Sequence, residues 1–478
     1  MNSLQVAPQT AGLQAQSFRT TLKYAQFLPD SVVASAKQSV SEQVTLPLAL
    51  EKDGVMGAIA PLDNQNDNAY FITIAVGTPA QNLLVQIDTG SSVAWTSSAW
   101  CVAAKKCNEN SGYNQTASST YTNLTSNAVT NITYGSGSLN GWLSSDKFVW
   151  GNYTIAQQTF VLANYEDSVL YNQQQHSNDG LIGLAYQNGL QANTSDPSYH
   201  PNIIVQLSKS NQIQEPVFSL WLNGSSTGGS LQSNGGEFVI GGTDVRHYTG
   251  DILNYTVSSI AKGYFWSLGL DSVQIMAYDS LTANPKYQSI LNIGRDAHAI
   301  LDSGTTFLTC PSNFFSNTLL PSLSTASGIP GGIGFHFSQN TGLTRFNCSF
   351  ASSLPPLGFT FSGGPTSLIY QLDWQDYITN DGKDCYLAIQ PLDIGVSGSV
   401  WILGDVFLRR VYSVYDLRGT IGLAYASNTF LGKGLPGGGV AQVAHVTPHS
   451  HGQRECPNAL LLLVAFFSLF FVSSVFFS

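Results

Sequence analysis

The sequence predicts an all-β protein with minor helix, organised as two pseudo-symmetric lobes. From Tyr70 to about residue 425, short runs of β-branched, aromatic and aliphatic residues alternate with Gly, Asn and Ser, which is the pattern of many short strands joined by turns. Helical periodicity is sparse, and the two short helices that we expect follow Asn202 and Pro311. One distinctive pattern occurs twice, and this repeat predicts two similar lobes.

The repeated pattern is an apolar run that ends in an aspartate, a hydroxyl residue, a glycine and further hydroxyl residues. It occurs as QIDTGSS at 86–92 and as AILDSGTT at 299–306. Each copy is followed about a hundred residues later by an apolar-apolar-Gly element, in DGLIGLA at 179–185 and VWILGD at 400–405. This period is far too long for a solenoid. It places a symmetry axis between Asp88 and Asp302.

The composition limits the possible partners. The chain has 478 residues, enough for more than one domain. Only 10% of residues are charged, and acidic residues outnumber basic ones by 29 to 19. Because no basic run is present to neutralise phosphates, we expect no nucleic-acid partner.

Glycosylation sequons indicate a secreted, glycosylated chain, although a chain merely rich in Asn, Ser and Thr is the alternative. The eight sequons begin at Asn114, Asn123, Asn131, Asn152, Asn193, Asn223, Asn254 and Asn347.

The cysteines are compatible with disulfides in an oxidising compartment. Cys101 and Cys107 are close enough in sequence to close a small loop, and Cys348 and Cys385 would close a larger one. Cys310 ends an apolar run, so we expect it to be a buried free thiol rather than half of a bridge.

The first 56 residues differ from the rest. Scattered basic residues between 18 and 52 and the position before the first strand predict a pro-segment over 1–56. No Lys-Arg pair separates this segment from the β-rich region, which favours autocatalytic release. No cationic start with an apolar region is visible, so a secretory signal peptide is not recognised. Either the sequence begins after the signal or its start is misassigned.

The C-terminal region predicts an attachment signal. Residues 429–458 are Gly-rich and then polar, as in a flexible stalk, and residues 459–478 carry no charge. A small-residue site, a polar spacer and a terminal apolar tail form the pattern of a GPI signal, with a retained single-pass tail or an artefact as alternatives. Cys456 lies beside this tail. His445, His449 and His451 do not predict a metal site, because nothing fixes their geometry.

The two aspartates suggest a specific chemistry. A strand gives rigid support, glycine allows close approach, and neighbouring hydroxyls orient a carboxylate. If two such loops meet about a twofold axis, both carboxylates cannot stay ionised, and the pair holds one proton. Such a pair can activate a water as base and protonate a carbonyl oxygen as acid, which gives a tetrahedral intermediate and no covalent acyl-enzyme.

The chain resembles the pepsin-like aspartic endopeptidases from about residue 68 to 425. The resemblance is carried by IDTGSSVAW at 87–95, ITYGSGS at 132–138, DGLIGLAY at 179–186, FVIGGTD at 238–244, LDSGTTFL at 301–308 and WILGDVFLR at 401–409. It implies a bilobal all-β fold with a deep central cleft and a catalytic dyad of Asp88 and Asp302. An acidic chain with a GPI tail is similar to cell-surface fungal members.

The resemblance also implies roles around the dyad. Ser91 and Thr305 would bind the outer carboxylate oxygens, and Thr89 and Ser303 would tie the two loops together. The loop glycines are Gly90 and Gly304. The residues expected on the flap that closes over substrate are Tyr134, Gly135 and Ser136, with Trp95 supporting the tyrosine from below.

The expected protein has two lobes and acts on peptides outside the cell or at its surface. We expect an N-terminal lobe over 57–245, a C-terminal lobe over 246–428, peptide or protein substrates, no cofactor, no metal and a monomer. The location would be extracellular or at the cell surface, with membrane contact only through the tail or a lipid anchor. A catalytically inactive binding protein of the same fold is the main alternative, but both aspartate motifs are intact. A glycosidase has no support beyond the carboxylate pair itself.

Overall fold

The computed structural model describes residues 57–427. The gaps within this range are 66, 108–111, 125–129, 135–136, 168–177, 187–200, 225–231, 259–264, 279–284, 339–341, 364–368, 381–382 and 394–398. The expected pro-segment, stalk and hydrophobic tail therefore lie outside the described residues, as do Gly135, Ser136, Asn193 and Cys456.

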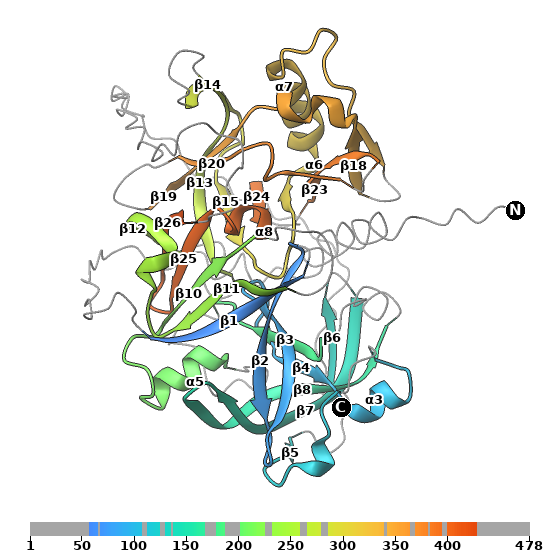
Figure 1. Ribbon diagram of the computed structural model, residues 1–478, viewed down its shortest axis with the longest axis vertical. Helices are drawn as coiled ribbons and strands as arrows, with labels where there is room; N and C mark the ends of the chain where they lie inside the picture. Colours follow the sequence, from blue (N-terminus) through green and yellow to red (C-terminus); the bar gives the residue numbers. More distant parts are fainter. Residues whose placement is uncertain are drawn as a thin grey trace, which may run out of the picture.

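A large sheet runs through the N-terminal lobe and continues into the junction of the two lobes (Figure 1). Its main path, in spatial order, is β12 (Tyr248–Thr256), β26 (Thr420–Ala426), β25 (Val411–Asp416), β10 (Val217–Leu222), β11 (Gln232–Ile240), β1 (Ala58–Gln65), β2 (Ala69–Val76), β3 (Gln81–Asp88), β9 (Gly180–Gly183), β4 (Trp95–Ser97), β8 (Tyr153–Glu166), β7 (Gly137–Trp150) and β5 (Thr122–Asn123). β6 (Thr130–Tyr134) pairs with β7. β10 and β25 pair antiparallel, so the first half of the chain and the last strands among the described residues share one sheet.

The C-terminal lobe contains two further sheets. The larger has the order β20 (Tyr370–Leu372), β19 (Leu357–Ser362), β13 (Ser267–Tyr278), β15 (Ala297–Leu301), β24 (Ser399–Leu403), β16 (Leu308–Cys310) and β23 (Ile389–Pro391), with β14 (Pro285–Leu291) beside β13. The smaller has the order β17 (His336–Ser338), β18 (Leu343–Phe346), β22 (Cys385–Leu387) and β21 (Ile378–Asn380). The bilobal all-β prediction is confirmed.

The two lobes repeat one local arrangement around each aspartate. β3 pairs in parallel with β9, and β9 pairs antiparallel with β4. In the same way β15 pairs in parallel with β24, and β24 pairs antiparallel with β16. The apolar-apolar-Gly elements of the sequence are thus the parallel neighbours of the strands that end in the aspartates.

Helices are short, as expected. They are α3 (Ala99–Ala103), η1 (Gln115–Ala117), α5 (Ile203–Lys209), η3 (Val245–His247), α6 (Ser312–Phe314), η5 (Phe315–Leu319), α7 (Leu320–Ala326), η6 (Cys348–Ser353) and α8 (Asp405–Leu408). Asn202 caps α5 by accepting a hydrogen bond from the Val205 N–H at 3.0 Å. The predicted helices after Asn202 and Pro311 are therefore confirmed. Within the described ranges, no helix has the length and apolarity needed to cross a bilayer.

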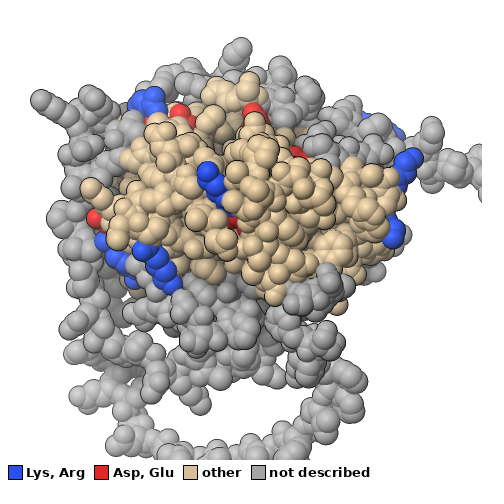
Figure 2. All heavy atoms as spheres, turned by 90° about the horizontal axis from the view of Figure 1, so that it is seen from below, with Lys and Arg blue, Asp and Glu red and all other residues tan. Residues whose placement is uncertain are grey.

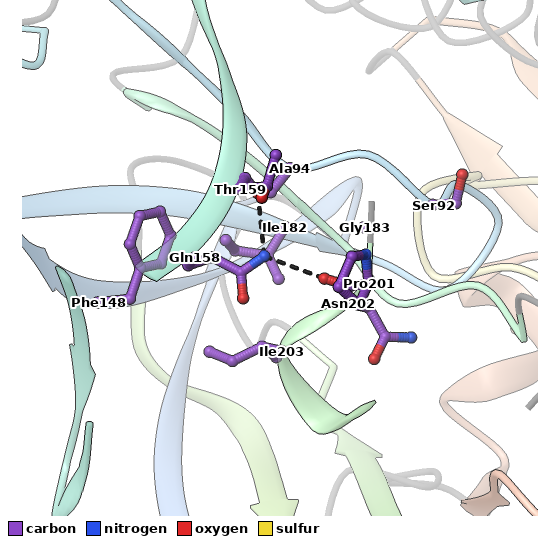
Figure 3. A pocket seen from close by; sticks show the side chains of 10 residues that line it. All are labelled: Ser92, Ala94, Phe148, Gln158, Thr159, Ile182, Gly183, Pro201, Asn202 and Ile203. Carbon is purple, nitrogen blue, oxygen red and sulfur yellow. Dashed lines mark hydrogen bonds between the residues drawn. The ribbon is translucent and has the colours of Figure 1, made fainter. Parts of the chain in front are cut away.

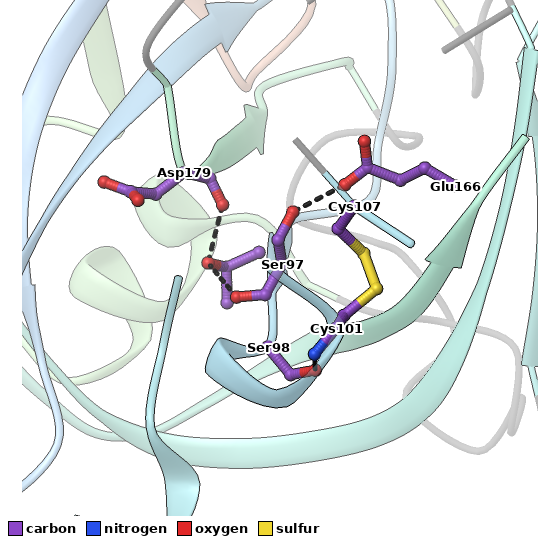
Figure 4. Close-up of a disulfide and its surroundings, with 7 residues drawn as sticks. Ser97, Ser98, Cys101, Cys107, Glu166 and Asp179 are labelled. Carbon is purple, nitrogen blue, oxygen red and sulfur yellow. Dashed lines mark hydrogen bonds between the residues drawn. A yellow bond between two sulfur atoms is a disulfide. The ribbon is translucent and has the colours of Figure 1, made fainter. Parts of the chain in front are cut away.

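Disulfides join Cys101 to Cys107 and Cys348 to Cys385. The first bridge joins α3 to Cys107 in the segment that follows it, beside the hydrogen bond that the Ser97 hydroxyl donates to Glu166 at 2.5 Å (Figure 4). Cys310 is free and buried, as expected from its place at the end of an apolar run. Burial raises the pKa of its thiol well above the ordinary value, and the charge of Asp393 adds to this.

The face drawn in Figure 2 is poor in charge. Figure 2 shows one face on which uncharged residues predominate over scattered Lys, Arg, Asp and Glu. Five sequon asparagines are exposed and Asn123 is half-buried. The exposed five are Asn114, Asn131, Asn152, Asn254 and Asn347.

Asn223 does not fit its predicted role as a glycan site. It is only 4% exposed. Its side-chain amide donates to the Asn234 carbonyl at 3.2 Å, and its own carbonyl accepts from Asn64 at 2.8 Å. An N-linked glycan needs a solvent-facing amide nitrogen, so the burial of Asn223 argues against a glycan at this sequon.

Candidate active site

The first aspartate motif folds into a tight loop at the end of β3. The Gly90 N–H donates to Asp88 Oδ1 at 2.8 Å, and the Ser91 hydroxyl donates to Asp88 Oδ2 at 2.6 Å. Asp88 is 2% exposed. Two donors on two different oxygens fix the plane of its carboxylate.

The second loop repeats this pattern atom for atom. The Gly304 N–H donates to Asp302 Oδ1 at 2.9 Å, and the Thr305 hydroxyl donates to Asp302 Oδ2 at 2.5 Å. Asp302 is fully buried. Thus Ser91 and Thr305 bind the carboxylates as the family resemblance suggested.

Thr89 and Ser303 connect the two loops directly. The Thr89 N–H donates to Ser303 Oγ at 3.1 Å, and the Ser303 N–H donates to Thr89 Oγ1 at 3.0 Å. Each hydroxyl also donates to a carbonyl of the opposite strand, Thr89 to Leu301 at 2.9 Å and Ser303 to Ile87 at 3.1 Å. The loops are therefore joined by four buried hydrogen bonds.

The two aspartates lie in one site. A Cβ atom added to Gly90 would collide with the Asp302 carboxylate, with Oδ2 only 2.8 Å away. The Asp302 side chain thus lies directly against the backbone of the Asp88 loop. Only glycine leaves this space open, which explains the glycine at 90.

The hairpin predicted as the flap is formed by β6 and β7, which pair from Tyr134 with Gly137 to Thr130 with Gly141. Its turn and the Tyr134 side chain lie outside what the structure describes. Close to its turn, Asp167 accepts hydrogen bonds from the Ser138 N–H at 2.6 Å and the Ser138 hydroxyl at 2.8 Å. The hairpin is therefore anchored to the end of β8.

Trp95 lies beneath this hairpin. It is 4% exposed and packs in a small apolar cluster with Leu139 of β7, Val161 of β8 and the partly buried Ile132 of β6. Its expected contact with the Tyr134 side chain stays a prediction.

A small pocket lies behind the Asp88 loop, between the sheet and the start of α5 (Figure 3). Gln158 lines it and donates to the Thr159 carbonyl at 2.9 Å and to the Pro201 carbonyl at 3.1 Å. Ser92 and Gly183 line its side towards the loop. The hydrogen bonds of Gln158 connect β8 to the segment just before α5.

One cluster of possible metal ligands lies in the described part of the chain, formed by Glu237, Asp244 and His247. The Arg246 guanidinium pairs with Asp244 and lies 3.7 Å from Glu237 Oε2. A cation is thus already supplied by the protein, and the cluster is better described as an ion-pair network.

Two buried aromatic residues near the dyad were not singled out from the sequence. Trp266 precedes β13, and Tyr415 lies in β25; both are fully buried. Burial raises the pKa of Tyr415, and the charges of Asp302 and Asp405 raise it further. Neither residue belongs to a local motif, so only the arrangement of strands from both halves reveals them.

Comparison with known proteins agrees with this geometry. The family described as eukaryotic aspartyl protease matches residues 69–426. The chain is 33% identical to pepsin A of Sus scrofa over 368 residues, which is 76% of this chain and 83% of that protein. It is 32% identical to cathepsin E of Aquarana catesbeiana over 376 residues, or 78% and 83% of the two chains. Gastricsin of Macaca fuscata fuscata is 31% identical over 364 residues, or 76% and 85%.

The fold, the paired aspartate loops and these similarities define the class of protein as an aspartic-type endopeptidase. The chain belongs to the eukaryotic aspartyl protease family.

Proposed function

We propose that this protein cleaves peptide bonds within polypeptides at acidic pH, through a water molecule activated jointly by Asp88 and Asp302. The observation that carries the proposal is the contact between the loops, where the Asp302 carboxylate lies against Gly90 of the Asp88 loop. Two carboxylates in one site share a proton, because both cannot be ionised at close range. Aspartic proteases are the standard example of such a pair.

The proposed reaction is general acid–base catalysis. The ionised carboxylate takes a proton from the water as its oxygen attacks the peptide carbonyl carbon. The protonated carboxylate gives its proton to the carbonyl oxygen, which yields a tetrahedral intermediate with no covalent bond to the enzyme. Because the proton belongs to the pair, neither aspartate has a fixed role as acid or base.

The proposed substrate is an extended peptide or protein segment held between the lobes. Backbone hydrogen bonds would supply much of the affinity, and side pockets would select side chains. The β6–β7 hairpin supports this proposal, since its sequence carries glycines at the turn that joins the two strands.

The test is cleavage of a denatured protein at about pH 4 by wild type, Asp88→Asn and Asp302→Asn. Each variant should lose at least about 100-fold in kcat, the scale of an acid–base contribution. Asp251→Asn, which changes an exposed aspartate of β12, is the matched control. Full activity in either dyad variant would remove the mechanism, and so would a rate that climbs steadily to about pH 8.

An inactive binding protein is the second candidate. It would hold a peptide with a tetrahedral hydroxyl isostere without cleaving a normal peptide. The complete set of hydrogen bonds around both carboxylates favours the enzyme.

We also propose a secreted or cell-surface zymogen. Residues 1–56 would be a pro-segment, removed before lobes 57–245 and 246–428 act as a monomer. N-terminal sequencing of the mature protein tests the pro-segment, and a mature start before residue 20 would reject it. Analytical sedimentation tests whether the protein is a monomer, and a stable dimer would reject this part of the proposal.

Glycosylation and anchoring belong to the same proposal. Glycans would occupy exposed sequons such as Asn152 and Asn347, but not Asn223, and peptide mapping after glycosidase treatment would test this. A GPI signal at 459–478 predicts release of the protein from cells by a GPI-specific phospholipase. An intact apolar C-terminal peptide in mature protein would exclude it.

A further inference from the structure

Trp266 lies at the junction of the lobes and touches elements from both. Its ring centroid is 4.8 Å from that of Tyr186, which lies just after β9. It is 5.2 Å from Tyr415 of β25 and 5.9 Å from Phe218 of β10. Trp266 is fully buried. Such an aromatic residue has a fixed orientation, so its polar N–H points in one direction.

The hydrogen bonds of Trp266 link the two aspartate loops by a second route. Its indole N–H donates to the Leu184 carbonyl at 2.8 Å, and the Leu184 N–H donates to the Asp88 carbonyl at 2.8 Å. Its own carbonyl accepts from the Leu301 N–H at 2.9 Å. The Leu301 carbonyl in turn accepts from the Thr89 hydroxyl at 2.9 Å. This series of hydrogen bonds therefore begins at Asp88 and ends at Thr89, its neighbour in the same loop.

We propose that Trp266 is a positioning residue for the reaction, acting as a second tie between the Asp88 and Asp302 loops. This inference rests on the proposed function. The Thr89–Ser303 bonds hold the loops at one place, and a connection at a single place leaves one loop free to tilt against the other. The Trp266 path fixes the Asp88 carbonyl and the strand before Asp302 from a different side, which removes that freedom.

Tilting would change the chemistry because the dyad depends on its spacing. Repulsion between two carboxylates falls as their separation grows, so a looser pair gives up its shared proton at lower pH. Misplacement by about 1 Å costs on the order of 100-fold in rate. Loss of the tie should therefore lower kcat more than it changes KM, and should shift the basic limb of the pH profile.

The two phenols packed against Trp266, those of Tyr186 and Tyr415, do not titrate in the acid range. Burial raises the pKa of Tyr186, and the charge of Asp416 adds to this effect. The pKa of Tyr415 is also raised by burial, with Asp302 and Asp405 contributing. Both phenols stay neutral at acidic pH, so neither is the source of a shift in the basic limb.

The experiment compares Trp266→Phe with Trp401→Phe. Trp401 of β24 is equally buried, but its indole N–H has no hydrogen-bond partner among the described residues. Both changes remove a similar volume, and only the first breaks the tie. We expect Trp266→Phe to lower kcat per active site by about 10-fold to 100-fold, with KM within about 2-fold. We expect the basic limb of the pH–rate profile of Trp266→Phe to lie at lower pH than the basic limb of Trp401→Phe.

Active sites are counted by titration with a tight-binding tetrahedral isostere, so partial unfolding does not imitate the effect. If Trp266→Phe does not fold, 3-benzothienylalanine at position 266 keeps the bicyclic shape and replaces only the N–H. Equal kcat per active site and equal pH limbs for the 266 and 401 variants would overturn the inference. An inactive wild-type protein from which the pro-segment has been removed would instead reject the proposed function.

Discussion

Thr89 and Ser303 are 214 residues apart in sequence, yet each backbone N–H donates to the side-chain hydroxyl of the other. Both residues are fully buried, and each hydroxyl donates onward to a carbonyl of the opposite strand. Every hydroxyl is therefore both acceptor and donor. No residue without a hydroxyl can replace either one and leave these groups satisfied.

Replacing either hydroxyl should weaken folding and catalysis together. Thr89→Val leaves the Ser303 N–H and the Leu301 carbonyl buried without their partner. We expect the free energy of unfolding to fall by about 1 to 3 kcal/mol, with kcat falling as the loops separate. Ser303→Ala should act in the same way, and the double variant should lose less than the sum, because both belong to one network. Urea unfolding and kcat per active site measure the two effects.

Thr96→Val is the matched control for this prediction. Thr96 is 3% exposed, and its hydroxyl donates to the Asp179 carbonyl at 2.7 Å within the N-terminal lobe. Its loss should cost similar stability without reducing kcat per active site. Equal kcat in Thr89→Val and Thr96→Val would contradict a role for the Thr89–Ser303 pair in positioning the dyad.

Gly90→Ala should inactivate the enzyme while most of the fold survives. The new methyl group would occupy the space of the Asp302 carboxylate, so the two loops must move apart. We expect a loss of at least about 100-fold in kcat. Gly334→Ala is the control, since a Cβ there meets only His336 at an ordinary 3.7 Å. An active Gly90→Ala enzyme would show that the loops tolerate a wider separation.

Acid should stabilise the N-terminal lobe through Asp179. Burial raises the pKa of Asp179 above its ordinary 3.8, although N–H groups of Leu84 and Gly112 bind the carboxylate and oppose the shift. The folded chain thus takes up this proton at a higher pH than the unfolded chain. The resulting stability is fully present below the ordinary pKa and is lost as the pH rises through the raised one.

Urea unfolding at several pH values from about 3 to 7 measures this contribution. Asp179→Asn removes the titrating proton, so the decline in stability towards neutral pH should become shallower. Asp251→Asn in the exposed part of β12 should leave the slope unchanged. Identical slopes in wild type and Asp179→Asn would exclude Asp179 as a source of acid stability.

The two disulfides should contribute unequally to the stability of the folded chain. Cys348 and Cys385 are 37 residues apart, whereas Cys101 and Cys107 are 6 apart. In the chain-entropy description, a bridge that closes a longer loop removes more conformational freedom from the unfolded state. It therefore adds about 4 kcal/mol to the free energy of unfolding for Cys348–Cys385 and about 2 kcal/mol for Cys101–Cys107. Paired Cys→Ala variants unfolded in urea under identical conditions test the order. A larger loss from removing the short bridge would contradict it.

Local patterns predicted the core of the site. Asp88 and Asp302 each end an apolar run and are followed by their own hydrogen-bond donors, so the signal lies within a few residues of sequence. The repeat of the apolar-apolar-Gly elements also predicted two lobes, because each such element pairs with its aspartate strand. These features are local or repeated, and therefore visible in one sequence.

Other features depend on distant contacts and left no such signal. Trp266 reaches Leu184 across 82 residues, and no pattern near either residue marks the pair. Asn223 carries a valid sequon, but its burial against Asn64 and Tyr70 argues against a glycan there. The same short motif can lie on the surface or inside, and only the packing of other strands distinguishes the two.

The pairing of β10 with β25 has a consequence for how the protein is made. Ser219 and Tyr412, whose hydroxyls hydrogen-bond across these strands, are 193 residues apart. At about 5 to 20 residues per second, a ribosome needs roughly 10 to 40 s to synthesise that stretch. During this time the newly made first half presents β10 with an open hydrogen-bonding edge, the kind of surface that chaperones cover and that aggregates recruit. Its partner β25, near the end of the described residues, is the strand that covers this edge.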